Sequence, residues 1–167
     1  MLAVLKDAIR ANPDDPRLLY DLGASAYSEG RVAEAEASFR RILERSADHA
    51  PALNDLALLL ADEKRALPEA RELAARAYAL APRDPVVSDT RAWVMLRNGE
   101  TEAALKALNE VAAALPQDGG VQFHLGVALL QAGATEAGRA SLRKAVSLGL
   151  PQRYRGEVKR LLDGGKP

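Results

Sequence analysis

Small residues recur in this chain at intervals of about 34 residues, and this periodicity limits its fold more than any other feature. If Pro16 is position 1 of the first repeat, position 8 is always Gly or Ala and holds Gly23, Ala57, Ala92 and Gly126. Position 15 holds Gly30, Lys64, Gly99 and Gly133. Small residues let two helices cross closely, and Gly tolerates the positive φ found at helix ends. Such a period is typical of stacked helical hairpins, none of which can bury its apolar face alone.

The segment 121–146 shows one such hairpin most clearly. Leu125 and Leu129 lie one turn apart on a first predicted helix, and Gly133 interrupts the helical pattern. Leu142 and Ala145 continue the apolar face on a second predicted helix. The pattern therefore predicts two short helices joined by a turn in each repeat.

The periodicity divides the chain into four repeats with a helix at each end. The repeats span residues 16–49, 50–84, 85–118 and 119–152. Residues 1–15 fit the second half of a repeat, with Leu5, Ala8 and Pro13 at positions 24, 27 and 32. Two interpretations of this segment stay open: an N-terminal capping helix, or the start of a fragment cut from a longer repeat protein.

A final helix is predicted over residues 153–163, followed by a tail at 164–167. It carries apolar or aromatic residues at helical spacing, which we expect to face inward: Tyr154, Val158, Leu161 and Leu162. From Arg139 onward the chain has 8 Lys or Arg and 2 Asp or Glu. This local charge of +6 indicates either an acidic partner at this end or a solvated cap face.

Two repeats depart from the pattern. The second has one extra residue in its turn, with Lys64 in place of Gly, and we expect Pro68 to be the first residue of the following helix. The third has Ser88 and Arg91 at positions 4 and 7, which are normally apolar. These polar residues predict that its first helix is rotated or loosely packed.

Composition supports helices and excludes several classes of protein. The chain is 48% hydrophobic, mostly Ala and Leu, and only 4% aromatic, which favours helix over a β-sandwich. Its formal net charge is zero, so no global field attracts nucleic acid. The longest apolar run, Leu56 to Ala61, is too short to cross a bilayer. Without cysteine the chain has no disulfide and no thiolate metal site.

These recurring positions resemble the tetratricopeptide repeat family over nearly the whole chain. The resemblance implies an all-α fold, a right-handed superhelical solenoid of antiparallel helix pairs. It also implies a non-catalytic scaffold that binds a partner protein or peptide in a concave groove.

In this family the first helices of successive repeats line the groove, so the resemblance also implies which side chains face a partner. They are Arg17, Tyr20, Asp21, Tyr27, Asn54, Asp55, Leu58, Asp62, Asp89, Thr90, Trp93, Arg97, Phe123, His124, Val127 and Gln131. Four of the seven aromatic residues of the chain are in this set, and we expect Trp93 and Phe123 to be exposed anchors for partner side chains. The alternative is that these two rings fill core space left by Ser88 and Arg91. Asn54 either pairs with a peptide amide or is a solvated polar residue.

The charge of the expected groove indicates what it binds. Some members of the family hold a C-terminal carboxylate with a Lys and Asn clamp, and the corresponding positions here carry no Lys. Asp21, Asp55 and Asp89 would repel a carboxylate. A neutral or cationic extended peptide is therefore the expected ligand.

No arrangement of residues predicts catalysis or a cofactor. His49 and His124 occupy unrelated repeat positions, and neither has a second metal ligand at helical spacing. Ser25, Ser28 and Ser141 lie on predicted helices with no His and Asp arrangement readable nearby. We therefore expect no enzyme activity, no cofactor and no bound metal.

The stretches SDTRAWVMLRNGETEAALKALNEV and VQFHLGVALLQAG also resemble bacterial repeat proteins of envelope and exopolysaccharide export systems. That resemblance implies a scaffold in a secretion assembly, and a periplasmic or envelope location if the chain is a fragment. Two other interpretations stay open. One is a self-assembly module whose terminal helices stack between chains, and the other is a recruiting domain of a larger enzyme.

Overall fold

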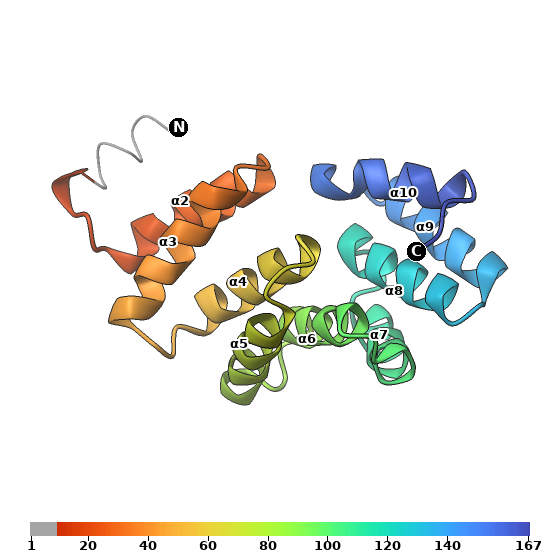
Figure 1. Ribbon diagram of the computed structural model, residues 1–167, viewed down its shortest axis with the longest axis horizontal. Coiled ribbons are helices and arrows are strands. Elements are labelled where there is room, and N and C mark those ends of the chain that lie inside the picture. Colours follow the sequence, from red (N-terminus) through yellow and green to blue (C-terminus); the bar gives the residue numbers. More distant parts are fainter. Residues whose placement is uncertain (1–9) are drawn as a thin grey trace. The chain divides into compact units, whose positions relative to one another are not determined.

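The structure is a computed structural model that describes residues 10–167, and every regular element in that range is a helix (Figure 1). In chain order these are α2 (Pro16–Ser28), α3 (Val32–Arg45), α4 (Ala50–Asp62), α5 (Leu67–Leu80), α6 (Pro85–Arg97), α7 (Thr101–Ala114), α8 (Gly119–Gln131), α9 (Thr135–Ser147), the 3₁₀ helix η1 (Gln152–Tyr154) and α10 (Arg155–Leu162). The predicted all-α fold is confirmed. The expected placements of Leu5 and Ala8 lie outside the described residues. Each described helix is too short or too polar to cross a bilayer.

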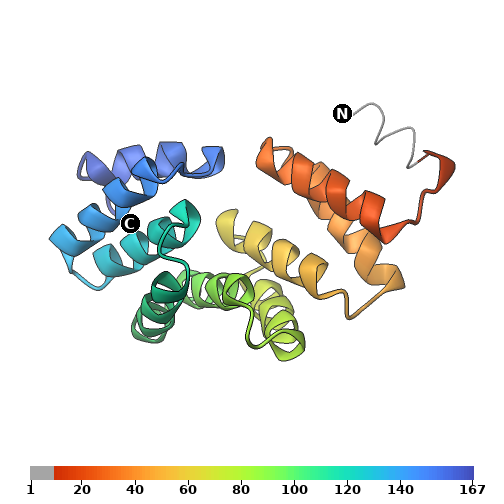
Figure 2. The ribbon, with the colours of Figure 1, turned by 180° about the vertical axis from the view of Figure 1, so that it is seen from behind.

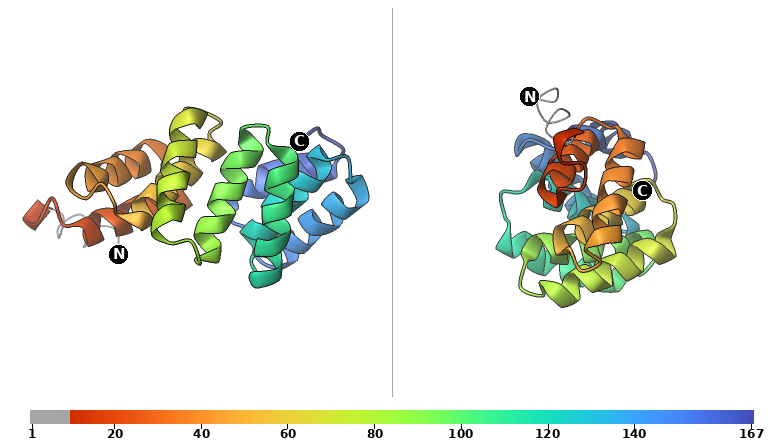
Figure 3. Two further views of the ribbon diagram at one scale, coloured as in Figure 1. Left: turned by 90° about the horizontal axis from the view of Figure 1, so that it is seen from below. Right: turned by 90° about the vertical axis from the view of Figure 1, so that its left-hand side faces the viewer.

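The chain divides into two compact units, and the boundary between them follows Pro82. In the first unit, α2 and α3 form one hairpin, α4 and α5 form the next, and α3 packs on α4 (Figure 2). In the second unit, α6 pairs with α7 and α8 pairs with α9, as the left view of Figure 3 shows for the green hairpin of α6 and α7. Within each unit the two first helices lie side by side, α2 with α4 and α6 with α8.

The repeat frame sets the helix bounds. All four first helices occupy positions 1 to 13 of their repeats, and the residue before each is its N-cap. Side chains accept backbone N–H groups at these caps: Asp15 from Arg17, His49 from Ala52, Asp84 from Val86 and Asp118 from Val121. Each acceptor satisfies a donor that the helix itself leaves unpaired, which stabilises the first turn by about 1 kcal/mol.

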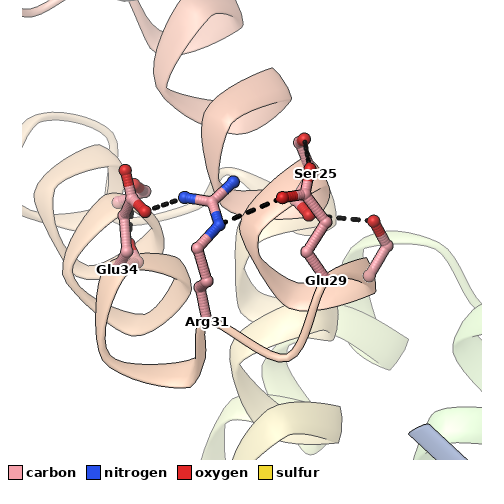
Figure 4. Close-up of polar contacts among 6 residues, drawn as sticks. Ser25, Glu29, Arg31 and Glu34 are labelled. Atoms are coloured by element: carbon pink, nitrogen blue, oxygen red, sulfur yellow. Dashed lines mark hydrogen bonds and ion pairs between the residues drawn. The ribbon is translucent and has the colours of Figure 1, made fainter. Parts of the chain in front are cut away.

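The turn between α2 and α3 is held by charged side chains around Gly30, whose φ is +75° (Figure 4). Arg31 donates from Nε to Glu29 Oε2 at 3.2 Å and from Nη1 to Glu34. Glu29 also accepts from the Ser25 hydroxyl at 2.9 Å. The guanidinium therefore ties the end of one helix to the start of the next.

The turn of the second repeat takes up its extra residue without Gly. Lys64 and Ala66 both adopt positive φ, at 51° and 47°. This left-handed conformation is the one expected of Gly at this position. It is sterically unfavourable for residues that have a Cβ, such as Lys64 and Ala66. We had expected Pro68 to be the first residue of the following helix. Because α5 begins at Leu67, Pro68 is its second residue.

Close helix crossings explain the small residues of the repeat. A Cβ on Gly126 would lie 2.7 Å from Leu142 Cδ2, and one on Gly138 would lie 2.9 Å from the carbonyl oxygen of Gly126. A Cβ on Gly23 would lie 2.6 Å from the Phe39 ring. The expectation that small residues let the two helices of a hairpin cross closely is therefore confirmed at Gly23, Gly126 and Gly138.

The first helix of the third repeat keeps the common frame despite its polar residues. Helix α6 covers the same 13 positions as its counterparts and buries Ala92 at position 8. The Ser88 hydroxyl donates to the Asp84 carbonyl oxygen at 3.0 Å, and Arg91 is exposed. The expectation of a rotated or loosely packed helix is therefore wrong, because seven residues of α6 are buried and neither polar side chain has to enter the core.

The C-terminal helix caps the second unit, as predicted. Tyr154, Val158 and Leu161 are buried, and Leu162 is half-buried. The cap begins one residue earlier than expected, as the 3₁₀ turn η1, and its α-helical part ends at Leu162.

Gly138→Ala is expected to lower the free energy of unfolding by about 1–2 kcal/mol. A methyl group at 2.9 Å from a backbone oxygen costs about 1–3 kcal/mol, and the higher helix propensity of Ala returns up to about 1 kcal/mol. The matched control is Gly156→Ala on α10, whose Cβ would meet nothing within 4 Å and which should stabilise by roughly 0.5 kcal/mol. Urea unfolding followed by circular dichroism measures both. Equal effects of the two substitutions would contradict the close crossing.

Candidate interaction surface

Two surfaces carry the side chains that the repeat frame assigns to the groove. We call them the α2–α4 face in the first unit and the α6–α8 face in the second. Each is formed by two neighbouring first helices. The two surfaces differ in how these side chains are packed.

On the α2–α4 face, two tyrosines hydrogen-bond carboxylates across the repeats. The Tyr20 hydroxyl donates to Asp55 Oδ2 at 2.8 Å, and the Tyr27 hydroxyl donates to Asp62. Both pairs join residues 35 apart in sequence, so they are the same contact repeated two helical turns further along α2 and α4. We call these two tyrosine–aspartate hydrogen bonds the rungs, and together they fix the position of α2 relative to α4.

These rungs leave carboxylates accessible. Asp55 and Asp62 are half-buried, Asp21 is exposed, and the exposed Arg17 is the one cation among the predicted groove residues of this face. Asp55 also accepts from the Asn54 side-chain amide at 3.1 Å. The α2–α4 face is therefore an acidic surface, and hydrogen bonds from the two tyrosines fix the positions of Asp55 and Asp62.

The environment of Tyr20 keeps its phenol protonated. Burial first, and then the neighbouring Asp55 carboxylate, raise the pKa of Tyr20 well above its ordinary value. The phenol therefore remains a hydrogen-bond donor at any pH near neutrality, and Asp55 remains its acceptor. Tyr20 also lies beside Phe39 and the ring of His49, each with a centroid 6.0 Å away.

On the α6–α8 face, the predicted anchors are buried in an aromatic cluster. Trp93 and Phe123 are both 0% exposed. The His124 ring stacks on Trp93 at 4.1 Å, and Tyr154 from η1 stacks on Phe123 at 4.3 Å. Arg97 places its guanidinium 4.0 Å above the Trp93 ring. We call Trp93, Phe123, His124 and Tyr154 the aromatic cluster.

Polar contacts hold the aromatic cluster together. His124 Nδ1 lies 2.8 Å from Asp89 Oδ2, and its Nε2 lies 3.2 Å from the Tyr154 hydroxyl. His124 is 2% exposed and Asp89 is 8% exposed, so both hydrogen bonds lie away from water. A carboxylate can only accept, so Nδ1 of His124 donates to Asp89, while Nε2 lies within hydrogen-bond distance of the Tyr154 hydroxyl. Arg97 also reaches Glu157 of α10 at 3.4 Å.

The expectation that Trp93 and Phe123 are exposed anchors is therefore wrong. Their rings pack on each other and on Tyr154, which removes their apolar surface from water. Val127 and Thr90 are buried with them, at 0% and 1% exposed. The alternative, that these two rings fill core space, is the one observed. The side chains that enclose them are His124 and Tyr154, and not the space expected beside Ser88 and Arg91.

The remaining predicted residues fall into two groups. Tyr27, Asn54, Asp89 and His124 are buried and hydrogen-bonded inside the chain. Those that keep exposed or half-buried surface are Arg17, Tyr20, Asp21, Asp55, Leu58, Asp62, Arg97 and Gln131. Arg97 contributes little, because its side chain is only 5% exposed. The accessible predicted residues thus lie mainly on the α2–α4 face.

The sequence did not predict the hydrogen bond between the Tyr154 hydroxyl and the His124 ring. The inward face of the last helix was predicted, but nothing in a 34-residue period shows that a ring 30 residues away hydrogen-bonds a histidine. Within residues 10–167, no group of three or more His, Asp or Glu side chains could hold a metal ion.

Comparisons with known proteins agree with this architecture. The sequence matches the family model described as Tetratricopeptide repeat over residues 2–50, 26–85 and 90–153. A TPR repeat-containing protein of Pseudomonas aeruginosa is 34% identical over 122 residues, which are 73% of this chain and 20% of that protein. The chain therefore spans about a fifth of the length of this relative.

Solved structures show the same fold. A thermophilic TPR protein of Thermus thermophilus has a TM-score of 0.71 at 20% identity, covering 97% of this chain and 87% of the other. MamA from Desulfovibrio magneticus has a TM-score of 0.59 at 21% identity, covering 88% and 81%. YrrB, described as a TPR protein with an unusual peptide-binding site, has a TM-score of 0.61 at 16% identity, covering 95% and 89%.

Tyr154→Ala is expected to open the aromatic cluster, lowering the free energy of unfolding by about 3–4 kcal/mol and shifting the emission of Trp93 to longer wavelength. Trp93 is the single tryptophan, so its fluorescence reports on this site alone. Tyr154→Phe keeps the stacking and loses only the hydrogen bond, so it should cost about 1 kcal/mol and leave the emission unchanged. An unchanged emission maximum in the alanine variant would show that Tyr154 does not enclose Trp93.

Proposed function

This chain belongs to the tetratricopeptide repeat family, and from that premise we propose that it is a non-catalytic scaffold that binds an extended, cationic peptide segment of a partner protein on the α2–α4 face. Proteins of this family bind proteins or peptides. The single observation that carries the proposal is the accessible acidic surface formed by Asp21, Asp55 and Asp62.

The spacing of the rungs suggests a peptide pattern. Asp55 and Asp62 are seven residues apart on α4, which corresponds to about 10 Å along the helix axis. A peptide in the polyproline II conformation rises about 3.1 Å per residue and presents every third side chain to the same side. Lysines three residues apart would therefore reach both carboxylates.

Preorganisation supports this choice of surface. The tyrosine hydroxyls hold Asp55 and Asp62 before any ligand arrives, so binding need not order them. Each carboxylate still has acceptor capacity for a cation, because an ionised carboxylate can accept several hydrogen bonds. Leu58, half-buried between the two aspartates in sequence, offers apolar contact for the stem of a lysine.

The setting that we propose is an assembly in the bacterial envelope or a polysaccharide-export system. It is supported by the sequence stretches that resemble such proteins and by a bacterial relative. A self-assembly module and a recruiting domain of a larger enzyme are the alternative settings. The relative is about five times longer than the matched segment, a length that fits a recruiting domain within a larger protein.

The proposal is tested with a fluorescein-labelled peptide, Gly-Lys-Ala-Ala-Lys-Ala-Ala-Lys, titrated with the full chain by fluorescence polarisation. We expect the double variant Asp55→Asn/Asp62→Asn to weaken binding by about 5- to 30-fold, because each of the two lost charge pairs across a partly desolvated surface costs roughly 0.5–1 kcal/mol. Asn preserves an acceptor for each tyrosine, so the rungs and the fold are kept.

The matched control is Glu102→Gln/Glu110→Gln, which removes the same charge from exposed positions on α7. Its affinity should stay within about twofold of the unsubstituted chain at 150 mM salt, where distant charges are screened. A peptide with Glu in place of Lys should not bind. If the aspartate variant binds as tightly as the control, the α2–α4 face is not the peptide site.

A further inference from the structure

A cavity of about 470 Å³ opens between α9 and α10 in the second unit. Its apolar lining includes Val146, Leu150, Val158 and Leu162. Val146 is 52% exposed, although Val is normally buried in a helix of this kind. Covering this surface would remove apolar area from water and so would stabilise whatever packs there.

The first unit shows which element covers the equivalent groove. There, α3 is the second helix of one repeat and α4 is the first helix of the next. The helix α5 packs on α4 and is joined to α3 by an ion pair. In the repeat frame α9 corresponds to α3 and α10 corresponds to α4. The groove between α9 and α10 is therefore the place of a second helix, and none of the described helices occupies it.

The charges around α5 show how such a helix is recognised. Arg40 of α3 binds Glu69 of α5 through two hydrogen bonds of 2.6 and 3.0 Å. The Arg40 guanidinium holds the pKa of Glu69 below its ordinary value, so this pair is ionised. Glu69 is the third residue of α5, where a negative charge also interacts favourably with the helix dipole.

The equivalent position on α9 is occupied by Arg143. Arg40 and Arg143 are both at position 25 of their repeats. Arg143 is exposed and takes part in none of the ion pairs found within residues 10–167. Arg155 and Lys159 add positive charge to the lining, against the single carboxylate of Asp163. The open groove is therefore apolar at its base and cationic at its edge.

We propose that the groove between α9 and α10, the α9–α10 seat, binds an amphipathic helix of a partner protein with a Glu or Asp in its first turn. The apolar face of that helix contacts Val146 and Val158, and its carboxylate pairs with Arg143 as Glu69 pairs with Arg40. This is a helix-in-groove mode of recognition. It is separate from peptide binding on the α2–α4 face and does not depend on it.

The test uses the helix that fills the equivalent place in the first unit. The probe is a fluorescein-labelled peptide with the α5 sequence, LPEARELAARAYAL, made helical by a hydrocarbon staple that replaces Arg71 and Ala75, which are exposed on α5. Polarisation is measured against the full chain. We expect saturable binding that Val146→Asp weakens about tenfold or more, since it puts a charge into the apolar base.

Two further variants make the result specific. Ser147→Asp adds the same charge one residue away, outside the lining, and should bind within about twofold of the unsubstituted chain. Arg143→Glu should weaken binding about tenfold, and a peptide with Lys in place of Glu69 should recover much of that loss. Circular dichroism and urea unfolding confirm that each variant is folded.

Three results would overturn the proposal, and a fourth would overturn its acidic first turn alone. The first is no saturable binding of the stapled peptide, and the second is equal binding to the Val146→Asp and Ser147→Asp variants. The third concerns a second copy of the chain. If sedimentation equilibrium shows a dimer that Val146→Asp dissociates, the occupant is another copy and not a partner helix. Loss of binding with Val146→Asp but not with Arg143→Glu would overturn the acidic first turn.

Discussion

The close crossing of two helices at small residues is the contact on which the rest of each unit depends. Where Gly126 meets Gly138, the backbones approach until a single added methyl group would touch a carbonyl oxygen at 2.9 Å. That approach brings the apolar side chains of α8 and α9 into one layer, with Leu142 fully buried. The hairpin still has one uncovered apolar face, so each hairpin needs a neighbour.

The neighbour brings two first helices together, and their facing side chains must then be satisfied. The chain does this in two ways. On the α2–α4 face, Tyr20 and Tyr27 reach carboxylates of the next repeat and leave those carboxylates accessible. On the α6–α8 face, Trp93 stacks with His124, and Tyr154 closes the cluster. Equivalent positions of one repeat frame therefore give an open acidic surface in one unit and a closed aromatic core in the other.

Much of the fold could be predicted from the sequence because small residues and helix caps act locally. Position 8 identified the crossing points, and the first residues of the four predicted repeats, 16, 50, 85 and 119, are the first residues of α2, α4, α6 and α8. The turn at Lys64 was less predictable, since two non-Gly residues take the positive φ that the repeat requires. Helix α6 was misjudged because the polar residues Ser88 and Arg91 point away from the core rather than shifting the helix.

The interaction surface was harder to predict than the fold. The period of the repeat shows which positions face the same side, but it does not show whether a distant ring covers them. Trp93 and Phe123 are buried because Tyr154, in another element, stacks against Phe123 and contacts His124. Asp55 and Asp62 keep part of their surface accessible, since each accepts a tyrosine hydroxyl from α2 and stays only half-buried.

The central claim is that the two faces differ, with an open α2–α4 face and a closed aromatic cluster. The most direct measurement is an NMR titration of the isotope-labelled full chain with the lysine peptide, following the backbone amides and the indole N–H of Trp93. We predict shifts at Tyr20, Asp55 and Asp62 while the indole signal stays in place. An indole signal that moves as far as the amides of α4 would contradict the account, because it would place the ligand on the α6–α8 face.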